Sequence, residues 1–493
     1  MKAFWNDVQA LVGRGLVNRA HSAHLLLKIS DVNAFKTWLR EDLARDHPRL
    51  ATTPDVSGRF DHKRPGRALY QIAFSPAGLR IMGAGDEVMQ GFSEPFVDGM
   101  APAPEDGAKT TRRAGILGDV GANHEAKWNW GGATGKGVKG HEIHVFLMLF
   151  SHFSKARGFW VQKALAPTSG LSLACGGRCV AGSPCAIMTR LERKKCDPDH
   201  PIEHFGFLDG LSQPVIKGLP RAEHMKRVRP ETYRLHAVAA GEFVLGQPNE
   251  RTIRTPYPDG FGENGSYLVV RQMDQHVGAF NTLVKTLARH YDGASTKDAN
   301  ELAAAKIMGR YRDGAPLTDM PRENGSFSSF GFAERDAAGL QCPIGSHIRR
   351  ANPRDSREDD PEISLRLSKR HRVMRRGRIY GDMAENGEFQ AKDEEGRGLL
   401  FMCVNADIAQ QYEFVQQSWL NHTTFAGLDG EVDPVVSGLE PSEKRYTAPD
   451  RPISAIVKRT QPLTTVRGGG YFFLPGKAAL TWLAEQPAVP EAS

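Results

Sequence analysis

The chain has 493 residues, of which 40% are hydrophobic, 25% charged and 8% aromatic, and its formal net charge is +7. This is the composition of a folded globular protein, and it excludes a chain that is mainly disordered. The longest uninterrupted apolar stretches, residues 145–150 and 399–404, are far shorter than the roughly 18 residues that a membrane-spanning helix needs. We therefore expect no membrane partner, and at roughly 100 to 200 residues per domain the length predicts two or three domains.

The net charge is the difference between 64 Lys and Arg residues and 57 Asp and Glu residues. It modestly favours anionic substrates, but basic and acidic residues are mixed along most of the chain, so we expect no nucleic-acid partner. At the N-terminus, Asn6 and Asp7 come before any apolar core of a signal peptide. This predicts a cytoplasmic protein, and the sequence leaves the oligomeric state open.

Short apolar runs and apolar alternation predict strands, in chain order at residues 23–29, 68–74, 143–150, 243–245 and 267–271. Helical periodicity predicts helices at residues 33–46, 158–166, 277–291, 300–310 and 406–420. Strands and helices follow one another without a regular βαβ order, which favours an α+β fold over a doubly wound sheet. The basic segment 218–240 has no clear periodicity and is the expected connection between two halves of the chain.

Four of the six cysteines, Cys175, Cys179, Cys185 and Cys196, lie close together in the sequence. Their spacing could hold a zinc ion or a metal cluster, although it lacks the C-x2-C pairs of familiar zinc sites. The alternative is a loop of reduced or partly paired thiols in a reducing compartment. The sequence does not decide between these two interpretations.

The first motif that can carry chemistry is HFGFLDGLSQP at residues 204–214. A single carboxylate, Asp209, lies among aromatic and apolar neighbours, with Gly206 three positions before it and Gly210 directly after it. Glycines let the backbone come close to a large or flat group, so Asp209 is a candidate proton shuttle in a dry site. The simpler interpretation is an aspartate in a glycine-rich turn.

The second motif is CPIGSHIRRANPR at residues 342–354. His347 is followed by Arg349, Arg350 and Arg354, which suits a metal-bound imidazole beside an anion, such as haem iron with its propionates. Phosphate binding would fit almost as well. A lone histidine is more often structural than a ligand.

The third motif is HRVMRRGRIYG at residues 371–381. If this segment is a strand, Arg375 faces the opposite side from Met374 and Arg376. One arginine of this motif could then point into a pocket while its neighbours stay in solvent. The alternative is a basic edge strand whose guanidinium groups are all solvated.

Together, the GxxDG motif at residues 206–210, GSHIRRANPR at 345–354 and RVMRRGRIYG at 372–381 resemble the motifs of the dye-decolourising peroxidases, which bind haem b. Further segments along nearly the whole chain resemble the family in the same order, among them residues 72–79 and 469–473. Three motifs of this length in the same order make the resemblance specific, whereas GxxDG alone would be weak.

The resemblance implies an α+β fold of two ferredoxin-like halves, each an antiparallel sheet flanked by helices, that enclose one haem b per chain. It places an N-terminal domain at residues 1–225, with the GxxDG motif, and a C-terminal domain at residues 226–493. The C-terminal domain would contribute His347 and Arg375.

Carried over to this sequence, the resemblance implies that His347 is the iron ligand, Asp209 the acid/base and Arg375 the stabiliser of charge. Asp433 is implied as the carboxylate that supports His347, because the family has an acid in a similar Asp-Pro context, and Asp407 is the alternative. The other expected cofactor contacts are Arg349, Gly206, Gly210, Leu400 and Met402.

The activity that the resemblance implies is that of a haem peroxidase. It would reduce hydrogen peroxide to water by one-electron oxidation of dyes, phenols or other organic reductants. A haem carrier, storage or haem-processing protein with incidental peroxidase activity is the alternative, and a phosphate- or nucleic-acid-binding protein is a third. An acid/base together with a fixed arginine argues for catalysis. Trp419 and Tyr380 are candidate entry points for electrons from bulky reductants.

Overall fold

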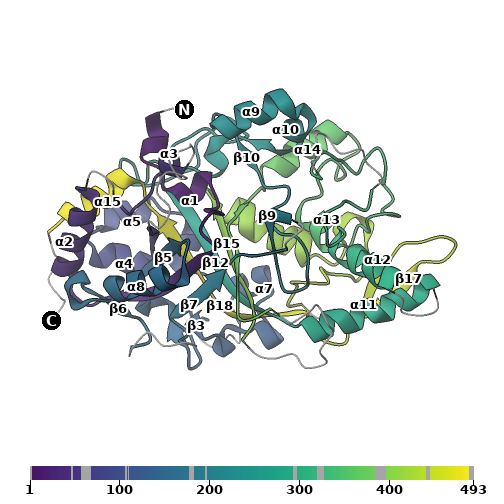
Figure 1. The fold of residues 1–493 in the computed structure, drawn as a ribbon, viewed down its shortest axis with the longest axis horizontal. Coiled ribbons are helices and arrows are strands. Elements are labelled where there is room, and N and C mark those ends of the chain that lie inside the picture. Colours follow the sequence, from purple (N-terminus) through teal and green to yellow (C-terminus); the bar gives the residue numbers. More distant parts are fainter. Residues whose placement is uncertain are drawn as a thin grey trace.

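The computed structural model describes residues 3–45, 48–56, 68–105, 108, 110–176, 183–194, 197–292, 297–318, 327–383, 396–439 and 445–487. Within these residues the main feature is a sheet of 12 strands. Most of these strands belong to two antiparallel sets, one from each half of the chain, which meet near the middle of the molecule (Figure 1).

The first set of strands follows the order β7-β1-β5-β2. All of its pairings are antiparallel. A helix follows the first strand and another follows the third, so the main elements run βαββαβ along the chain, which is the ferredoxin-like pattern. These elements are β1 (His21–Ile29), α2 (Val32–Leu43), β2 (Leu69–Phe74), β5 (Val145–Ser151), α8 (Ser154–Ala164) and β7 (Ala186–Arg190).

The second set repeats this arrangement, in the order β18-β12-β15-β14. In both sets the fourth strand lies beside the first, and the third lies between the first and the second. The predicted α+β fold with two ferredoxin-like halves is therefore confirmed. The elements of the second set are β12 (Ser266–Gln275), α11 (Val277–Asp292), β13 (Met374–Arg375), β14 (Arg378–Tyr380), β15 (Gly398–Asn405), η9 (Ala409–Glu413), η10 (Val415–Leu420) and β18 (Thr464–Leu474).

The two sets join each other at both ends. β14 pairs with β7, where Tyr380 lies opposite Thr189, and β18 pairs with β2, where Phe473 lies opposite Phe74. Because β18 also pairs with β12, the order of strands closes on itself. Apolar side chains from both sets consequently share one core.

Helices cover the outside of the sheet. α2 begins after its N-cap Asp31, whose carboxylate accepts a hydrogen bond from the first turn at 2.9 Å. Phe35 and Leu39, one helical turn apart, are fully buried and attach this helix to the sheet. In Figure 1, α2 lies with α4 (Pro76–Ile81) and α15 (Lys477–Glu485) at one end of the molecule, and α11 lies at the other.

The structure has further α-helices and strands, and among the described residues no helix has the length and apolarity needed to cross a lipid bilayer. The helices are α1 (Ala10–Gly13), α3 (Thr53–Val56), α5 (Asp86–Gln90), α6 (Glu94–Asp98), α7 (Arg112–Leu117), α9 (Pro220–Val228), α10 (Pro230–His236), α12 (Lys297–Met308), α13 (His347–Ala351) and α14 (Pro361–Lys369). The strands are β3 (Trp130–Gly132), β4 (Val138–Lys139), β6 (Leu171–Leu173), β8 (Glu192–Lys194), β9 (Asp197–Ile202), β10 (Val215–Ile216), β11 (Ala237–Val238), β16 (Arg445–Ala448) and β17 (Ala455–Lys458).

One predicted strand, residues 243–245, is wrong. These three apolar residues are buried, but they form a turn in which the Val244 N–H donates to the Ala240 carbonyl at 2.9 Å. A short apolar run indicates burial and does not by itself distinguish a strand from a buried turn. The other four predicted strands correspond to β1, β2, β5 and β12.

One predicted connection and one predicted helix also need correction. The segment 218–240 is not irregular, because it holds α9 and α10, and each of them has a proline in its first turn. Residues 406–420 are helical but contain the wide turns of η9 and η10 in place of a regular α-helix. The helices predicted at 33–46, 158–166, 277–291 and 300–310 correspond to α2, α8, α11 and α12.

Candidate functional site

His347 is the first residue of α13 and is paired with Asp433. The His347 Nδ1 atom lies 2.9 Å from Asp433 Oδ2, and the Asp433 side chain is fully buried while that of His347 is 25% exposed. The other oxygen of Asp433 accepts hydrogen bonds from the N–H groups of Val435, at 2.9 Å, and Val436, at 2.7 Å. This histidine pair fixes the ring through Nδ1 and leaves Nε2 available for a metal.

The environment of Asp433 keeps its carboxylate ionised. Burial raises its pKa, but the interaction with His347 and the hydrogen bond from Val436 lower it by more, so the net pKa is below the ordinary value. Asp407 lies elsewhere, with its carboxylate accepting the Gln410 N–H at 2.9 Å, and burial raises its pKa. The structure thus places Asp433, and not Asp407, against His347.

Asp209 and Arg375 form a second pair, on the loop after β9 and on β13. Arg375 Nη1 lies 3.4 Å from Asp209 Oδ1, and the two side chains are 40% and 27% exposed. The same Asp209 oxygen accepts the Gly210 N–H at 2.6 Å, and Arg375 Nη2 donates to the Leu211 carbonyl at 2.8 Å. This arginine pair combines an accessible carboxylate with a guanidinium cation that can donate several hydrogen bonds.

Glu203 holds the loop that carries Asp209, a role that the sequence analysis missed. Its carboxylate accepts the N–H groups of Phe205 and Phe207, at 2.9 and 3.0 Å, and the side-chain amide of Gln275 at 2.6 Å. Burial raises the pKa of Glu203 above its ordinary value. Gly206 lies inside this turn with φ of 89°, a conformation that favours glycine.

Ser212, three residues after Asp209, is the meeting point of three further arginines. Its hydroxyl accepts from Arg310 at 2.8 Å and from Arg354 at 2.9 Å, and its carbonyl accepts from Arg372 at 2.6 Å. All three arginines are buried. We call Arg310, Arg354, Arg372 and Arg375 the arginine cluster.

The arginine cluster has an excess of buried positive charge. Within the described residues, Arg310, Arg354 and Arg372 form no ion pair with a carboxylate, and the buried Nε of Arg354 has no hydrogen-bond partner. Burial lowers the pKa of Arg310 to about 10, and burial together with the charge of Arg375 lowers the pKa of Arg372 to about 9. Such a cluster is suited to a ligand with carboxylate groups.

A short segment connects the arginine cluster to the histidine pair. Arg310 follows Gly309, whose carbonyl lies 3.7 Å from the Cys342 thiol. That thiol lies 3.5 Å from the hydroxyl of Ser346, the residue before His347. The residues just after α12 therefore connect the arginine cluster with the segment that carries His347.

Two predicted cofactor contacts, Leu400 and Met402, lie on the face of β15 opposite to the one that Arg375 shares. Arg375 lies opposite Cys403, and side chains of opposed residues in an antiparallel pair share one face. Because faces alternate along a strand, Leu399, Phe401 and Cys403 share the face of Arg375, and Leu400 and Met402 point the other way. Both are fully buried in the main core.

Arg349, another predicted cofactor contact, is bonded to groups of the protein interior. Its guanidinium donates to Asp336 Oδ2 at 3.2 Å and to the Cys342 carbonyl at 2.7 Å, and it lies over the Phe332 ring. The residue is 2% exposed. Its hydrogen-bonding groups therefore serve the protein interior, and Arg354 of the same motif joins the cluster instead.

The two aromatic residues singled out from the sequence are both buried. Trp419 is 4% exposed, and its ring meets His371 and Phe414 edge to face, at 5.4 and 5.5 Å between centroids. Tyr380 is 7% exposed, and its hydroxyl donates to Asp274 Oδ1 at 2.6 Å. A bulky reductant would therefore contact the neighbours of each ring and not the ring itself.

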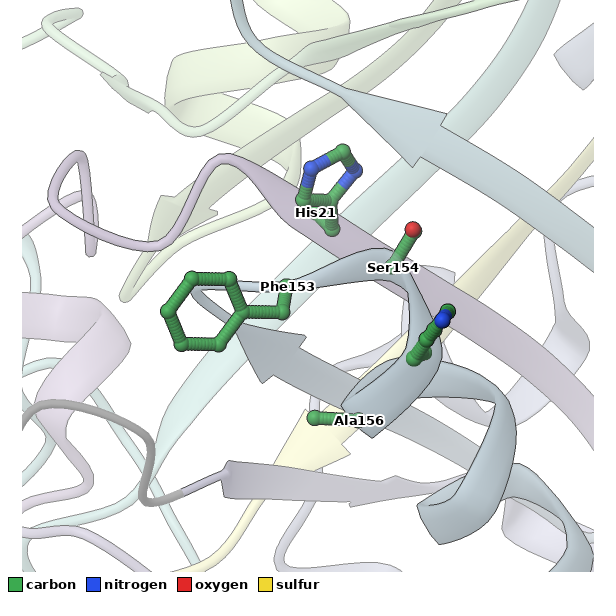
Figure 2. A pocket seen from close by; sticks show the side chains of 5 residues that line it. His21, Phe153, Ser154 and Ala156 are labelled. Atoms are coloured by element: carbon green, nitrogen blue, oxygen red, sulfur yellow. The ribbon is translucent and has the colours of Figure 1, made fainter.

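The cysteine stretch and one surface hollow lie apart from these residues. Cys175 and Cys185 are free thiols, and the Cys175 N–H donates to the Cys185 sulfur at 3.1 Å; Cys179 and Cys196 lie outside the described residues. Within the described part of the chain no three ligating side chains are grouped as a metal site. A hollow at the start of α8 has a volume of about 480 Å³ and is lined by His21, Phe153, Ser154, Lys155 and Ala156, and Figure 2 shows how His21 and Phe153 lie there.

Comparison with known proteins supports the resemblance expected from the motifs, although no protein-family model matches the chain. The chain is 32% identical over 295 residues to a multifunctional dye peroxidase of an Amycolatopsis strain, an alignment that covers 57% of this chain and 60% of that protein. The chain therefore matches less than two thirds of that relative. It is 26% identical over 495 residues to a dye-decolorizing peroxidase of Exidia glandulosa, covering 97% of this chain and 86% of that protein.

Comparison with solved structures points to the same family of proteins. The crystal structure of a DyP-type peroxidase of Anabaena matches with a TM-score of 0.75 at 24% identity, covering 98% of this chain and 95% of that chain. The chain is thus a relative of the dye-decolourising peroxidases in sequence and has their fold.

Proposed function

We propose that the protein is a haem peroxidase that reduces hydrogen peroxide to water and oxidises an organic reductant one electron at a time. The observation that carries the proposal is the contact of Asp209 with Arg375 at 3.4 Å, which puts an accessible acid/base beside a permanent cation. A protein that only carries or stores haem needs neither group. The names of the relatives point to the same activity.

The residues present fit haem b, at one per chain. His347 Nε2 would bind the iron, because Nδ1 is engaged by Asp433. Three members of the arginine cluster, Arg310, Arg354 and Arg372, would bind the two carboxylates of haem, which supply the negative charge that these arginines lack among the described residues. When bound, haem supplies an iron that binds peroxide and holds its oxidising equivalents.

The roles of the protein groups follow from their chemistry. An oxygen of the Asp209 carboxylate takes a proton from one peroxide oxygen and returns it to the other, which leaves as water. The Arg375 guanidinium stabilises the negative charge on the leaving oxygen. The Asp433 carboxylate holds the His347 Nδ1–H and so keeps the ring in one tautomer and orientation.

The reductant is proposed to be a phenol or a dye. One solved structure with this fold is a complex of a dye-decolorizing peroxidase with 2,6-dimethoxyphenol, and that compound is a suitable first substrate to test. We also propose a cytoplasmic location, no nucleic-acid or membrane partner, and a division into domains near residues 225 and 226.

The test is the reaction of purified protein loaded with haem b. We expect an intense absorbance band near the violet edge, and oxidation of 2,6-dimethoxyphenol only when hydrogen peroxide is present. Asp209→Asn should retain haem and lower the peroxide-dependent rate by about 10²- to 10⁴-fold, because the proton acceptor is lost. Asp429→Asn, at a side chain that is 93% exposed, is the control. A protein that binds haem and responds equally to both substitutions is a carrier or store.

A further inference from the structure

Gln213 is bonded to the backbone of Arg375 at two points. Its side-chain amide donates to the Arg375 carbonyl at 3.2 Å, and its side-chain carbonyl accepts the Arg375 N–H at 3.2 Å. This is how the peptide of a neighbouring antiparallel strand would bond to Arg375. The side chain is half-buried, four positions after Asp209.

These bonds are made along the edge of β13 that does not face β15. The N–H of the next residue, Arg376, donates to the Met402 carbonyl in β15 at 2.7 Å. Since N–H and C=O groups alternate in direction along a strand, the peptide groups of Arg375 point away from β15. Gln213 meets them there, where no strand of the main sheet pairs with β13 among the described residues.

Arg375 is consequently held to the Asp209 loop through both its backbone and its side chain. Its guanidinium donates to the Leu211 carbonyl at 2.8 Å and to Asp209 at 3.4 Å. The Gln213 amide fixes the backbone from which that side chain extends. A rigid support of this kind is what a catalytic pair needs, because a displacement of about 1 Å can lower a rate by about a hundredfold.

We propose that Gln213 is a positioning residue that sets the distance between Asp209 and Arg375. The proposal rests on the peroxidase function proposed above. Of the two bonds, the one to the Arg375 N–H matters more. The Arg375 carbonyl also accepts from Arg376 Nη1 at 3.0 Å, whereas its N–H has Gln213 as its acceptor. An unpaired N–H in a half-buried strand is unfavourable, so loss of its acceptor would weaken the contact between the loop and the strand.

Three substitutions of Gln213 distinguish this function from packing. Gln213→Leu has a similar size and no acceptor, Gln213→Met is an unbranched second form without a strong acceptor, and Gln213→Glu keeps an acceptor oxygen. The nearby charges of Asp209, Arg372 and Arg375 are the same in all of them. Gln410→Leu is the control, because Gln410 is exposed and its side chain accepts from Arg251.

We expect the rate of reaction with hydrogen peroxide, measured by stopped flow on the haem-loaded protein, to fall about ten- to a hundredfold in the Leu and Met forms. The Glu form should stay within about threefold of the parent, since the acceptor for the Arg375 N–H remains. In the protein without haem, hydrogen exchange at the Arg375 amide should be faster in the Leu and Met forms than in the parent, the Glu form or Gln410→Leu.

The opposite order would overturn the proposal. If Gln213 only fills space, Leu and Met are tolerated and Glu, which brings a charge, is the damaging substitution. Unchanged amide exchange in the Leu form also contradicts the proposal, whatever the activity. A parent protein that does not react with peroxide disproves the proposed function instead, and the exchange measurement still decides on the contact itself.

Discussion

The histidine pair and the arginine pair each combine one carboxylate with one nitrogen-containing side chain, and they differ in how firmly they are held. In the histidine pair the two atoms are 2.9 Å apart and the carboxylate is fully buried. In the arginine pair they are 3.4 Å apart, and the side chains are 27% and 40% exposed. A group that binds a metal permanently gains from rigidity, and a group that moves protons must remain accessible to its substrate.

The carboxylates that support the two regions also differ, because their pKa values are shifted in opposite directions. Asp433 is fully buried and Glu203 is half-buried, and both accept backbone N–H groups. The pKa of Asp433 is lowered overall, because its strongest partner is His347 and Arg350 is near. The pKa of Glu203 is raised, because burial outweighs its amide donors and the charge of Asp209 opposes it. The direction of each pKa shift therefore depends on whether the partners of the carboxylate outweigh its burial.

The largest expected effect is at the histidine pair, with His347→Ala. Haem affinity should fall by more than about a hundredfold, because loss of an outer partner of a metal ligand alone costs about 10- to 100-fold and here the ligand itself is removed. Titration of the protein with haem, followed by absorbance, measures this. His141→Ala, at an exposed histidine, is the control. A His347→Ala protein with unchanged haem affinity and spectrum would contradict the assignment.

The next effect is at the arginine pair, with Arg375→Leu. Haem should be retained, and the rate of reaction with peroxide should fall by about 10²- to 10³-fold, because charge stabilisation of the leaving oxygen is lost. Stopped-flow absorbance gives the rate, and Arg366→Leu at an exposed position controls for the loss of an arginine. Equal rates for the parent and Arg375→Leu would remove Arg375 from the mechanism.

A third prediction concerns the dependence of stability on pH in the Asp209 loop. The pKa of Glu203 is raised in the folded state, so its contribution to stability is fully present below the ordinary glutamate pKa of about 4.3 and is lost as pH rises through the folded value. The free energy of unfolding of the parent should therefore fall relative to that of Glu203→Gln as pH increases over this range. Urea unfolding of both proteins at several pH values measures the difference, and a difference that is constant with pH would show that Glu203 is not perturbed.

The smallest expected effect is on bulky reductants. Trp419→Phe should lower the turnover of a large dye severalfold and leave haem content and the peroxide reaction intact, because the indole is the more easily oxidised ring. Since Trp419 is 4% exposed, the dye would contact its neighbours His371 and Phe414. Tyr380→Phe should act in the same way more weakly. Parental dye turnover in both variants would show that electrons enter elsewhere.

The sequence was sufficient where chemistry is concentrated in a motif, and insufficient where only three-dimensional packing decides. The placement of Asp433 against His347 agrees with the choice made from its Asp-Pro context. The six apolar residues 399–404 carry no alternation, so the sequence does not predict which face of β15 is shared with Arg375, and Leu400 and Met402 lie on the other face.

The arginines illustrate the same limit. The motifs contain Arg349, Arg354 and Arg372 without any local sign of which one meets a buried carboxylate and which ones gather at Ser212. Gln213 lies in the first motif, yet its contact with Arg375 depends on a pairing across 162 positions of sequence. Contacts of that range follow from the tertiary fold alone.

The closed order of strands has a consequence for any attempt to divide the chain. If the two halves were produced separately, each would expose two strand edges that are paired in the whole protein: those of β7 and β2 in one half, and those of β14 and β18 in the other. Unpaired edges of this kind promote association with other chains. The separated halves should therefore aggregate alone and recombine when they are mixed, which would make this fold a natural scaffold for a two-fragment complementation system.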